Sequence, residues 1–292
     1  YLNSRRKRGL KMIGNRRYWK ACAKQFLSGK WGIAILAMMA APALNTIGTM
    51  AAIKLFPGDS FLAWLLGEAF LFIVSLLSMV ISTGYNFMLL NMARGREYRF
   101  GNLIYMFKKG SDGVLSAALI MALIDTVLMI PFYYMVNMTA PAAETMEAVL
   151  EWSQPIMYSA LAATVLGVVI KLPFAMAFYI LADNPQMKGR EALKKSASLM
   201  KGHMMQYLVL QISFIPLMFL SILFLYVGLL WVMPYIYATN TIFYMDVTGE
   251  LKETHKKHMH EVADWIPKEL EDTAADKELQ EQRTGDDYNS EA

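Results

Sequence analysis

The sequence predicts an all-α, polytopic membrane protein, a transmembrane helix bundle of about six spans. Of the 292 residues, 56% are hydrophobic and 18% are charged, a balance that soluble domains rarely show. The apolar residues fall in runs of about 20, the length a helix needs to cross the roughly 30 Å hydrocarbon layer. Backbone groups in lipid must be satisfied within the segment, and no ten-residue alternating pattern indicates a barrel. The runs are therefore expected to be helices.

The expected spans divide the chain into a basic N-terminal segment (1–32), a six-span membrane domain (33–246) and an acidic, largely disordered tail (247–292). The division between the last two spans is the weakest, because almost nothing separates them. A five-span count would move the C-terminus to the outer side. The six runs are Ile33–Ile53, Phe61–Leu90, Val114–Val136, Ile156–Ala182, Tyr207–Leu225 and Leu229–Asp246.

The distribution of Lys and Arg predicts the orientation, because these residues accumulate in cytoplasmic loops. Bases are dense before the first span, between the second and third, and between the fourth and fifth. The connection between the first and second spans has Lys54 as its single basic residue. The connection between the third and fourth spans has Glu144, Glu147 and Glu151 and no basic residue. Both termini are thus expected in the cytoplasm. The net charge of +4 then indicates contact with anionic lipids and not with nucleic acid.

A short basic segment with helical periodicity precedes each expected hairpin of two spans, so the spans are expected to form three hairpins. Spacings of three and four place apolar side chains on one stripe, which suits a cytoplasmic helix lying in the membrane interface. Such helices either pack beneath the bundle or form a collar that docks a partner or senses lipid. The candidate surface for the second role is Lys20, Lys24, Lys108, Lys109, Lys194 and Lys195. The expected apolar stripes are Trp19, Ala23 and Phe26; Phe100, Leu103, Ile104 and Phe107; and Ala192, Leu193, Ala197 and Met200.

Two opposite charges fall inside the expected spans. Asp125 in the third and Lys171 in the fourth reach a similar depth in antiparallel neighbours, so they are expected to pair. Charges within spans are expensive and are often functional. The pair either fixes the register of two helices or belongs to a polar path for a proton or solute.

No motif in the sequence predicts catalysis, a cofactor or a metal site. The zinc-protease helix, the serine elbow, the phosphate-binding glycine loop and the dinucleotide fingerprint do not occur. His255, His258 and His260 lack a carboxylate or cysteine that would complete a ligand set. The chain is therefore not expected to be an enzyme.

Several stretches resemble the domain-of-unknown-function 975 family of bacterial integral membrane proteins. They are Tyr179-Ile-Leu-Ala-Asp-Asn-Pro185, Ala192-Leu-Lys-Lys-Ser196, Leu199-Met-Lys-Gly202, Pro234-Tyr235 and Ile242-Phe-Tyr244. The resemblance extends from about Arg16 to Asp246. It implies a bacterial cell membrane and carries no established activity, so it assigns no catalytic residue.

Two classes of function are left by these observations. The first is a non-enzymatic membrane scaffold, assembly factor or partner subunit, favoured because the spans are poor in polar groups while the cytoplasmic side is elaborate. The second is a small-solute transporter or channel. That function requires Asp125, Lys171, Asn45 and Asn86 to converge on one hydrated cavity.

Overall fold

The computed structural model describes residues 16–57, 60–138, 145–223 and 226–251, and every regular element in them is a helix. The chain divides after Val247 into a compact first unit and a second unit, Thr248–Ala292. The basic residues before Arg16 and most of the acidic tail, with His255, His258 and His260, lie outside the described residues.

The first unit is built from helices joined by short connections. In chain order they are α2 (Arg16–Leu27), α3 (Trp31–Met38), α4 (Ala40–Leu55), α5 (Phe61–Ala93), the 3₁₀ helix η1 (Phe100–Ile104), α6 (Tyr105–Lys109), α7 (Ser111–Met138), α8 (Met146–Lys171), the 3₁₀ helix η2 (Leu172–Phe174), α9 (Ala177–Asp183), α10 (Gly189–Met200), α11 (Met204–Ile212), α12 (Ile215–Leu223) and α13 (Leu229–Val247).

Five stretches of the described chain are long and apolar enough to cross a membrane. The sixth expected span, Leu229 to Asp246, forms α13 but is not one of these five, so the number of crossings stays a prediction. The fifth expected span is interrupted between α11 and α12, near Ser213. The five stretches are Trp31–Leu55, Phe61–Ala93, Ser111–Val136, Met146–Asp183 and Met204–Leu223.

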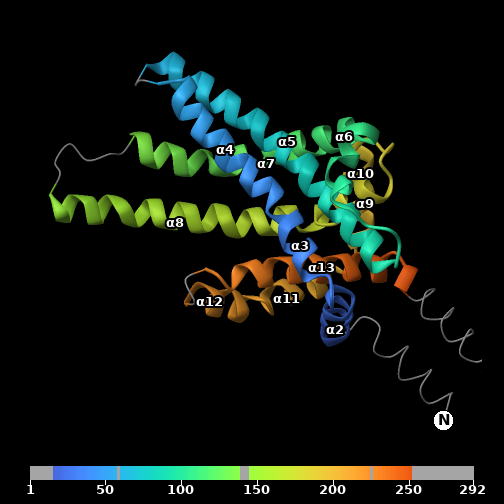
Figure 1. The fold of residues 1–292 in the computed structure, drawn as a ribbon. Helices are drawn as coiled ribbons and strands as arrows, with labels where there is room; N and C mark the ends of the chain where they lie inside the picture. The colour runs from blue at the N-terminus through green and yellow to red at the C-terminus, as the bar shows by residue number, and fades with distance from the viewer. Residues whose placement is uncertain (1–15, 58–59, 139–144, 224–225, 252–292) are drawn as a thin grey trace, which may run out of the picture. The chain divides into compact units, whose positions relative to one another are not determined.

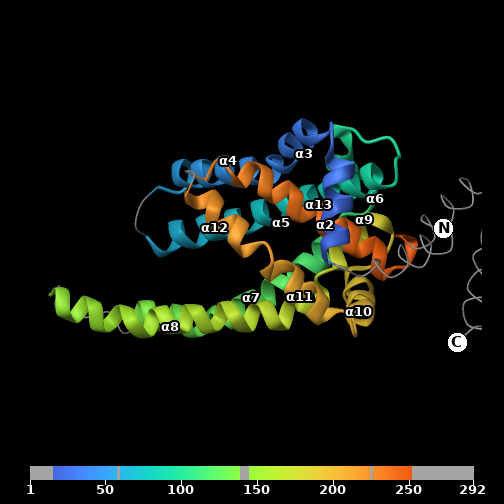
Figure 2. The same ribbon diagram turned by 90° about the horizontal axis from the view of Figure 1, so that it is seen from below.

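Helices α4 and α5, α7 and α8, and α12 and α13 form pairs in the first unit, and the end of α4, the end of α7 and the end of α12 lie on the same side of it (Figure 1). Helices α2, α6, α9 and α10 gather on the opposite side (Figures 1 and 2). We call these four helices, with the adjoining ends of α5 and α13, the base. The α7–α8 pair extends farthest from the base (Figure 2).

The buried core lies in the base and does not run the length of the helix pairs. On α5, most residues from Val80 to Met92 are buried, whereas large apolar side chains between Phe61 and Leu77 are exposed. On α13, the residues from Ala238 onward are buried. Apolar side chains that face lipid need no protein partner. The outer halves of the pairs therefore have the surface expected of helices in a bilayer.

Close backbone contacts in the base depend on glycine. A Cβ atom added to Gly110 would lie 2.3 Å from the carbonyl oxygen of Pro185, and one added to Gly189 would lie 2.4 Å from the backbone nitrogen of Ala117. Atoms at these distances overlap, and the obstacle is backbone that cannot rotate away. The start of α7 and the segment that leads into α10 can therefore approach each other only because these positions lack side chains.

Substitution of Gly189 by alanine tests this contact. We expect Gly189→Ala to lower the free energy of unfolding by about 1–3 kcal/mol, because the new methyl group forces the backbone apart. The measurement is thermal unfolding of the purified protein in detergent. Gly67→Ala on α5 is the matched control, since nothing lies within 4 Å of its Cβ position and alanine favours a helix by about 1 kcal/mol. Equal destabilisation by both substitutions would contradict the contact.

Candidate functional site

The apolar face of α2 lies against α13 and not on the surface. Trp19 is fully buried, its Nε1 donates a hydrogen bond of 2.9 Å to Oδ2 of Asp246, and its ring packs edge-on against Phe243 at 5.0 Å between centroids. Ala23 is buried on the same face. Two residues of the expected stripe are thus covered by protein, whereas the third, Phe26, is only partly buried.

Lys20, expected on the outer face of α2, is engaged inside the molecule. Its Nζ donates to the carbonyl oxygen of Ser213 at 3.1 Å and lies 3.9 Å from the ring centroid of Phe214. Burial is the main reason why the pKa of the Lys20 amine falls below its ordinary value. Of the two candidate lysines on this helix, only Lys24 is exposed.

The second expected amphipathic helix differs from its prediction. Residues 100–107 form the 3₁₀ helix η1 followed by α6, so no single α-helical stripe exists. Leu103 is buried as expected, whereas Phe100, Ile104 and Phe107 are exposed. The backbone is held close to α5 here, since a Cβ on Gly84 would lie 2.2 Å from the carbonyl oxygen of Leu103. This tertiary contact has no signature in local periodicity.

The third expected segment forms the helix α10, on which Ala197 of the expected stripe is only partly buried. Ala192, Leu193 and Met200 on α10 are buried, while Lys194 and Lys195 are exposed. Ser196 is also buried, and its hydroxyl donates to the carbonyl oxygen of Pro173 at 2.8 Å and accepts from the backbone N–H of Met176 at 3.2 Å. This side chain fastens α10 to η2.

Four basic side chains line an open cavity of about 810 Å³ where the start of α7 meets the start of α10. Two of the predicted surface lysines, Lys108 and Lys109, lie here beside Lys188 and Arg190, whereas Lys194 and Lys195 do not line it. Asp112 and Glu191 offset part of the positive charge. The candidate surface is therefore divided among separate regions.

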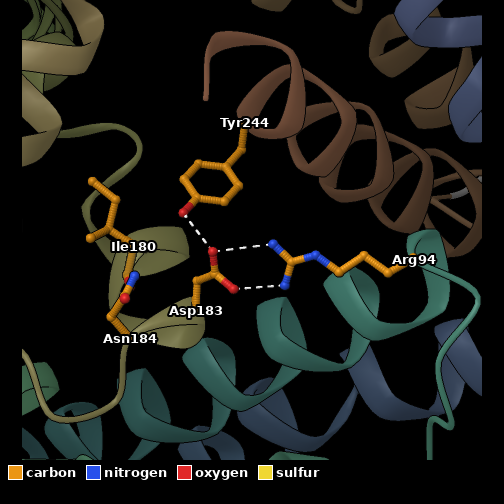
Figure 3. A network of polar contacts seen from close by, with 5 residues as sticks. All are labelled: Arg94, Ile180, Asp183, Asn184 and Tyr244. Atoms are coloured by element: carbon orange, nitrogen blue, oxygen red, sulfur yellow. Dashed lines mark hydrogen bonds and ion pairs between the residues drawn. The ribbon is translucent and has the colours of Figure 1, made fainter. Parts of the chain in front are cut away.

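A charged pair that the sequence analysis did not predict holds the base together. Arg94 at the end of α5 donates from both terminal nitrogens to Asp183 at the end of α9, at 2.6 and 3.1 Å. The hydroxyl of Tyr244 on α13 donates to the same carboxylate at 3.1 Å (Figure 3). The side chains of Arg94 and Asp183 are 9% and 29% exposed. We call these three residues the polar clamp.

The polar clamp joins α5, α9 and α13 through a single carboxylate (Figure 3). Bidentate arginine–carboxylate pairs have a fixed, planar geometry, so this contact sets how the helices meet. Arg94 is the first basic residue after the second apolar run, and Asp183 is the first acidic residue after the fourth apolar run. Opposite charges at these two ends were a signal that could have predicted the pair.

The structure brings Asp125 and Lys171 together. Nζ of Lys171 lies 2.7 Å from Oδ1 of Asp125, and this ion pair links α7 to α8. The side chain of Lys171 is 37% exposed and that of Asp125 is 49% exposed, so the pair is not buried in the protein. Asn45 lies on α4, where its Oδ1 accepts a hydrogen bond of 2.8 Å from Ser78 on α5. Asn86 is buried on α5. The cavity that Asn45 lines does not include Asp125, Lys171 or Asn86 among its lining residues.

Comparison with known proteins identifies a family. The family described as "Protein of unknown function (DUF975)" matches residues 12–251. The chain belongs to this family. No curated protein and no solved structure matches this DUF975 protein. Two of the stretches that carry the resemblance contain Asp183 and Tyr244, which are members of the polar clamp.

Loss of the carboxylate tests the polar clamp. We expect Asp183→Asn to lower the free energy of unfolding by about 2–4 kcal/mol, because the largely buried guanidinium of Arg94 loses its bidentate carboxylate and Tyr244 loses a charged acceptor. Thermal unfolding in detergent measures the effect. Arg99→Gln is the control, since Arg99 pairs with Glu97 on the surface and exposed pairs contribute about 0–1 kcal/mol. A destabilisation by Asp183→Asn no larger than that of the control would show that the clamp is dispensable.

Proposed function

We propose that this DUF975 protein is a non-enzymatic scaffold or partner subunit of the bacterial cell membrane. Its base holds apolar hairpins apart so that they associate with another integral membrane protein. The observation that carries the proposal is the half-exposed Asp125–Lys171 pair on the α7–α8 hairpin. Helix α8 makes its principal contacts with α7 and η2, and large apolar side chains along it are exposed.

The cost of charge in lipid is the reason to expect a partner at this pair. A charged side chain at the centre of a membrane helix costs about 2.5–3.5 kcal/mol. Mutual pairing offsets part of this cost, but atoms that face acyl chains gain no further hydrogen bonds. A polar group on a neighbouring transmembrane helix would satisfy them, and such contacts contribute about 0.6 kcal/mol or more each.

The proposed topology has six crossings as three hairpins, with both termini in the cytoplasm. In this arrangement the base lies at the cytoplasmic face, where Lys108, Lys109, Lys188 and Arg190 would meet anionic headgroups. The common direction of the three helix pairs supports this topology (Figure 1).

Labelling of engineered cysteines tests the topology. Cys22 is the only cysteine in the sequence, and its replacement by alanine leaves the engineered cysteine as the single thiol. This replacement removes only a weak background signal, because burial raises the pKa of the Cys22 thiol and slows its alkylation. Ser60→Cys, at the turn between α4 and α5, is expected to react with a membrane-impermeant maleimide in intact cells. Ser28→Cys, in the base, is expected to react only after permeabilisation. Reaction of both positions from outside would refute the topology.

Purification in mild detergent tests the partnership. We expect the full chain to retain a stoichiometric membrane protein, and the double substitution Asp125→Leu with Lys171→Leu to lose it. Replacement of an ion pair by apolar residues is often neutral or stabilising, so the double variant should still fold. Asp125→Asn alone should destabilise the protein by about 2–3 kcal/mol, because it leaves Lys171 without a counter-charge.

The double variant distinguishes a docking role from a structural one. If the pair only fixes the register of α7 and α8, retention of the partner should follow thermal stability across the variants. Met157→Ala is the matched control, since Met157 is exposed on the same hairpin and carries no charge. Recovery of the same partner with the double variant, or of no partner with the unaltered chain, would refute the proposal.

A further inference from the structure

A second cavity, of about 260 Å³, lies between α3, α4, α5 and α13, and no residue of α7 or α8 lines it. Its wall is mainly apolar, with Met38, Ile81 and Met233 among the lining side chains. Its polar lining residues are Asn45, Ser82, Tyr85 and Tyr237. No charged side chain of the described residues lines it, so the cavity suits a neutral group. A largely apolar wall with a few polar atoms is typical of small-molecule sites.

Tyr85 is only 3% exposed. Its hydroxyl is buried and has no hydrogen-bond partner within the described part of the chain. Its ring is fixed edge-on against Tyr237, with 5.4 Å between centroids. A buried polar group without a partner costs about 1–3 kcal/mol. Native proteins rarely leave such a group without an explanation. A ligand that accepts a hydrogen bond would provide one.

Asn45, one of the polar side chains of the wall, is already engaged. Asn45 uses its Oδ1 to accept the hydrogen bond from Ser78. The hydroxyl oxygen of Ser78 also lies 3.5 Å from the carbonyl oxygen of Ala41. Asn45 itself is exposed, so the cavity opens beside α4, on an apolar surface that would face acyl chains. A molecule dissolved in the membrane can therefore reach the mouth of this cavity without passing through water.

We propose that this cavity binds a neutral, membrane-soluble amphiphile through a carbonyl-type oxygen that accepts a hydrogen bond from the hydroxyl of Tyr85. The apolar body of the ligand fills the space beside Met38 and Met233. An apolar cavity of about 150 Å³ holds benzene, so the larger volume here suits a ring or chain head with its attached oxygen. This binding site goes beyond the proposed partnership and does not depend on it.

Tyr85→Phe tests the site because it removes one oxygen and leaves the cavity. Without ligand, we expect this variant to have a higher melting temperature than the unaltered protein, since the unpaired hydroxyl is gone. A residue with a purely structural hydroxyl would show the opposite sign. The probes are decyl phenyl ketone and undecylbenzene, which differ in the carbonyl oxygen.

Binding is measured with the purified full chain in detergent, as the shift in melting temperature with probe concentration. The unaltered protein should bind the ketone, and should bind undecylbenzene more weakly. Tyr85→Phe should bind the ketone about five- to tenfold more weakly, which is the loss of one hydrogen bond, and undecylbenzene without change. Tyr105→Phe is the matched control, because Tyr105 stacks on Phe87 outside the cavity.

A second variant separates binding from effects on the hydroxyl. Ala41→Leu should fill the cavity and weaken the binding of both probes, with Tyr85 intact. The proposal is overturned if neither probe binds the unaltered protein, if the ketone has no advantage over undecylbenzene, or if Tyr85→Phe lowers the melting temperature and retains the ketone. None of these results bears on the Asp125–Lys171 experiment, so the two proposals fail separately.

Discussion

The carboxylate of Asp183 is the contact on which the arrangement of the base depends. It receives both terminal nitrogens of Arg94 and the hydroxyl of Tyr244, and so joins helices that are far apart in the sequence. A partly buried ion pair adds little net stability, because removal of the charges from water offsets their attraction. Its geometry nevertheless favours this arrangement, since the bidentate contact with Arg94 forms only when the ends of α5 and α9 meet in one orientation.

The base and the helix pairs are stabilised by different physical effects. In the base, side chains such as Trp19 and Phe243 are fully buried, and glycines such as Gly189 allow backbone to meet backbone. In the outer halves of the pairs, apolar side chains are exposed, and there is no hydrophobic force that would bring such helices together in lipid. A firmly packed base therefore allows the pairs to diverge and leaves their polar groups accessible to other membrane components.

The pairing of Asp125 with Lys171 could be predicted because both residues lie in long apolar runs, where depth follows directly from position in the sequence. The polar clamp follows the same logic but was missed, because Arg94 and Asp183 lie at the ends of their runs and resemble ordinary loop charges. The helix expected over residues 100–107 was wrong in its winding, because a close contact with Gly84 overrides the local periodicity.

The sequence by itself determined the all-helical class, the presence of long apolar helices suited to a membrane, and the family. These properties depend on the lengths of apolar runs and on motifs, which are local. Only the tertiary structure decided that α2 lies against α13, that Lys20 is engaged with Phe214, and that Tyr85, whose buried hydroxyl has no hydrogen-bond partner in the described part of the chain, lines a cavity. Those features arise where distant segments meet, and neither composition nor periodicity records which segments do so.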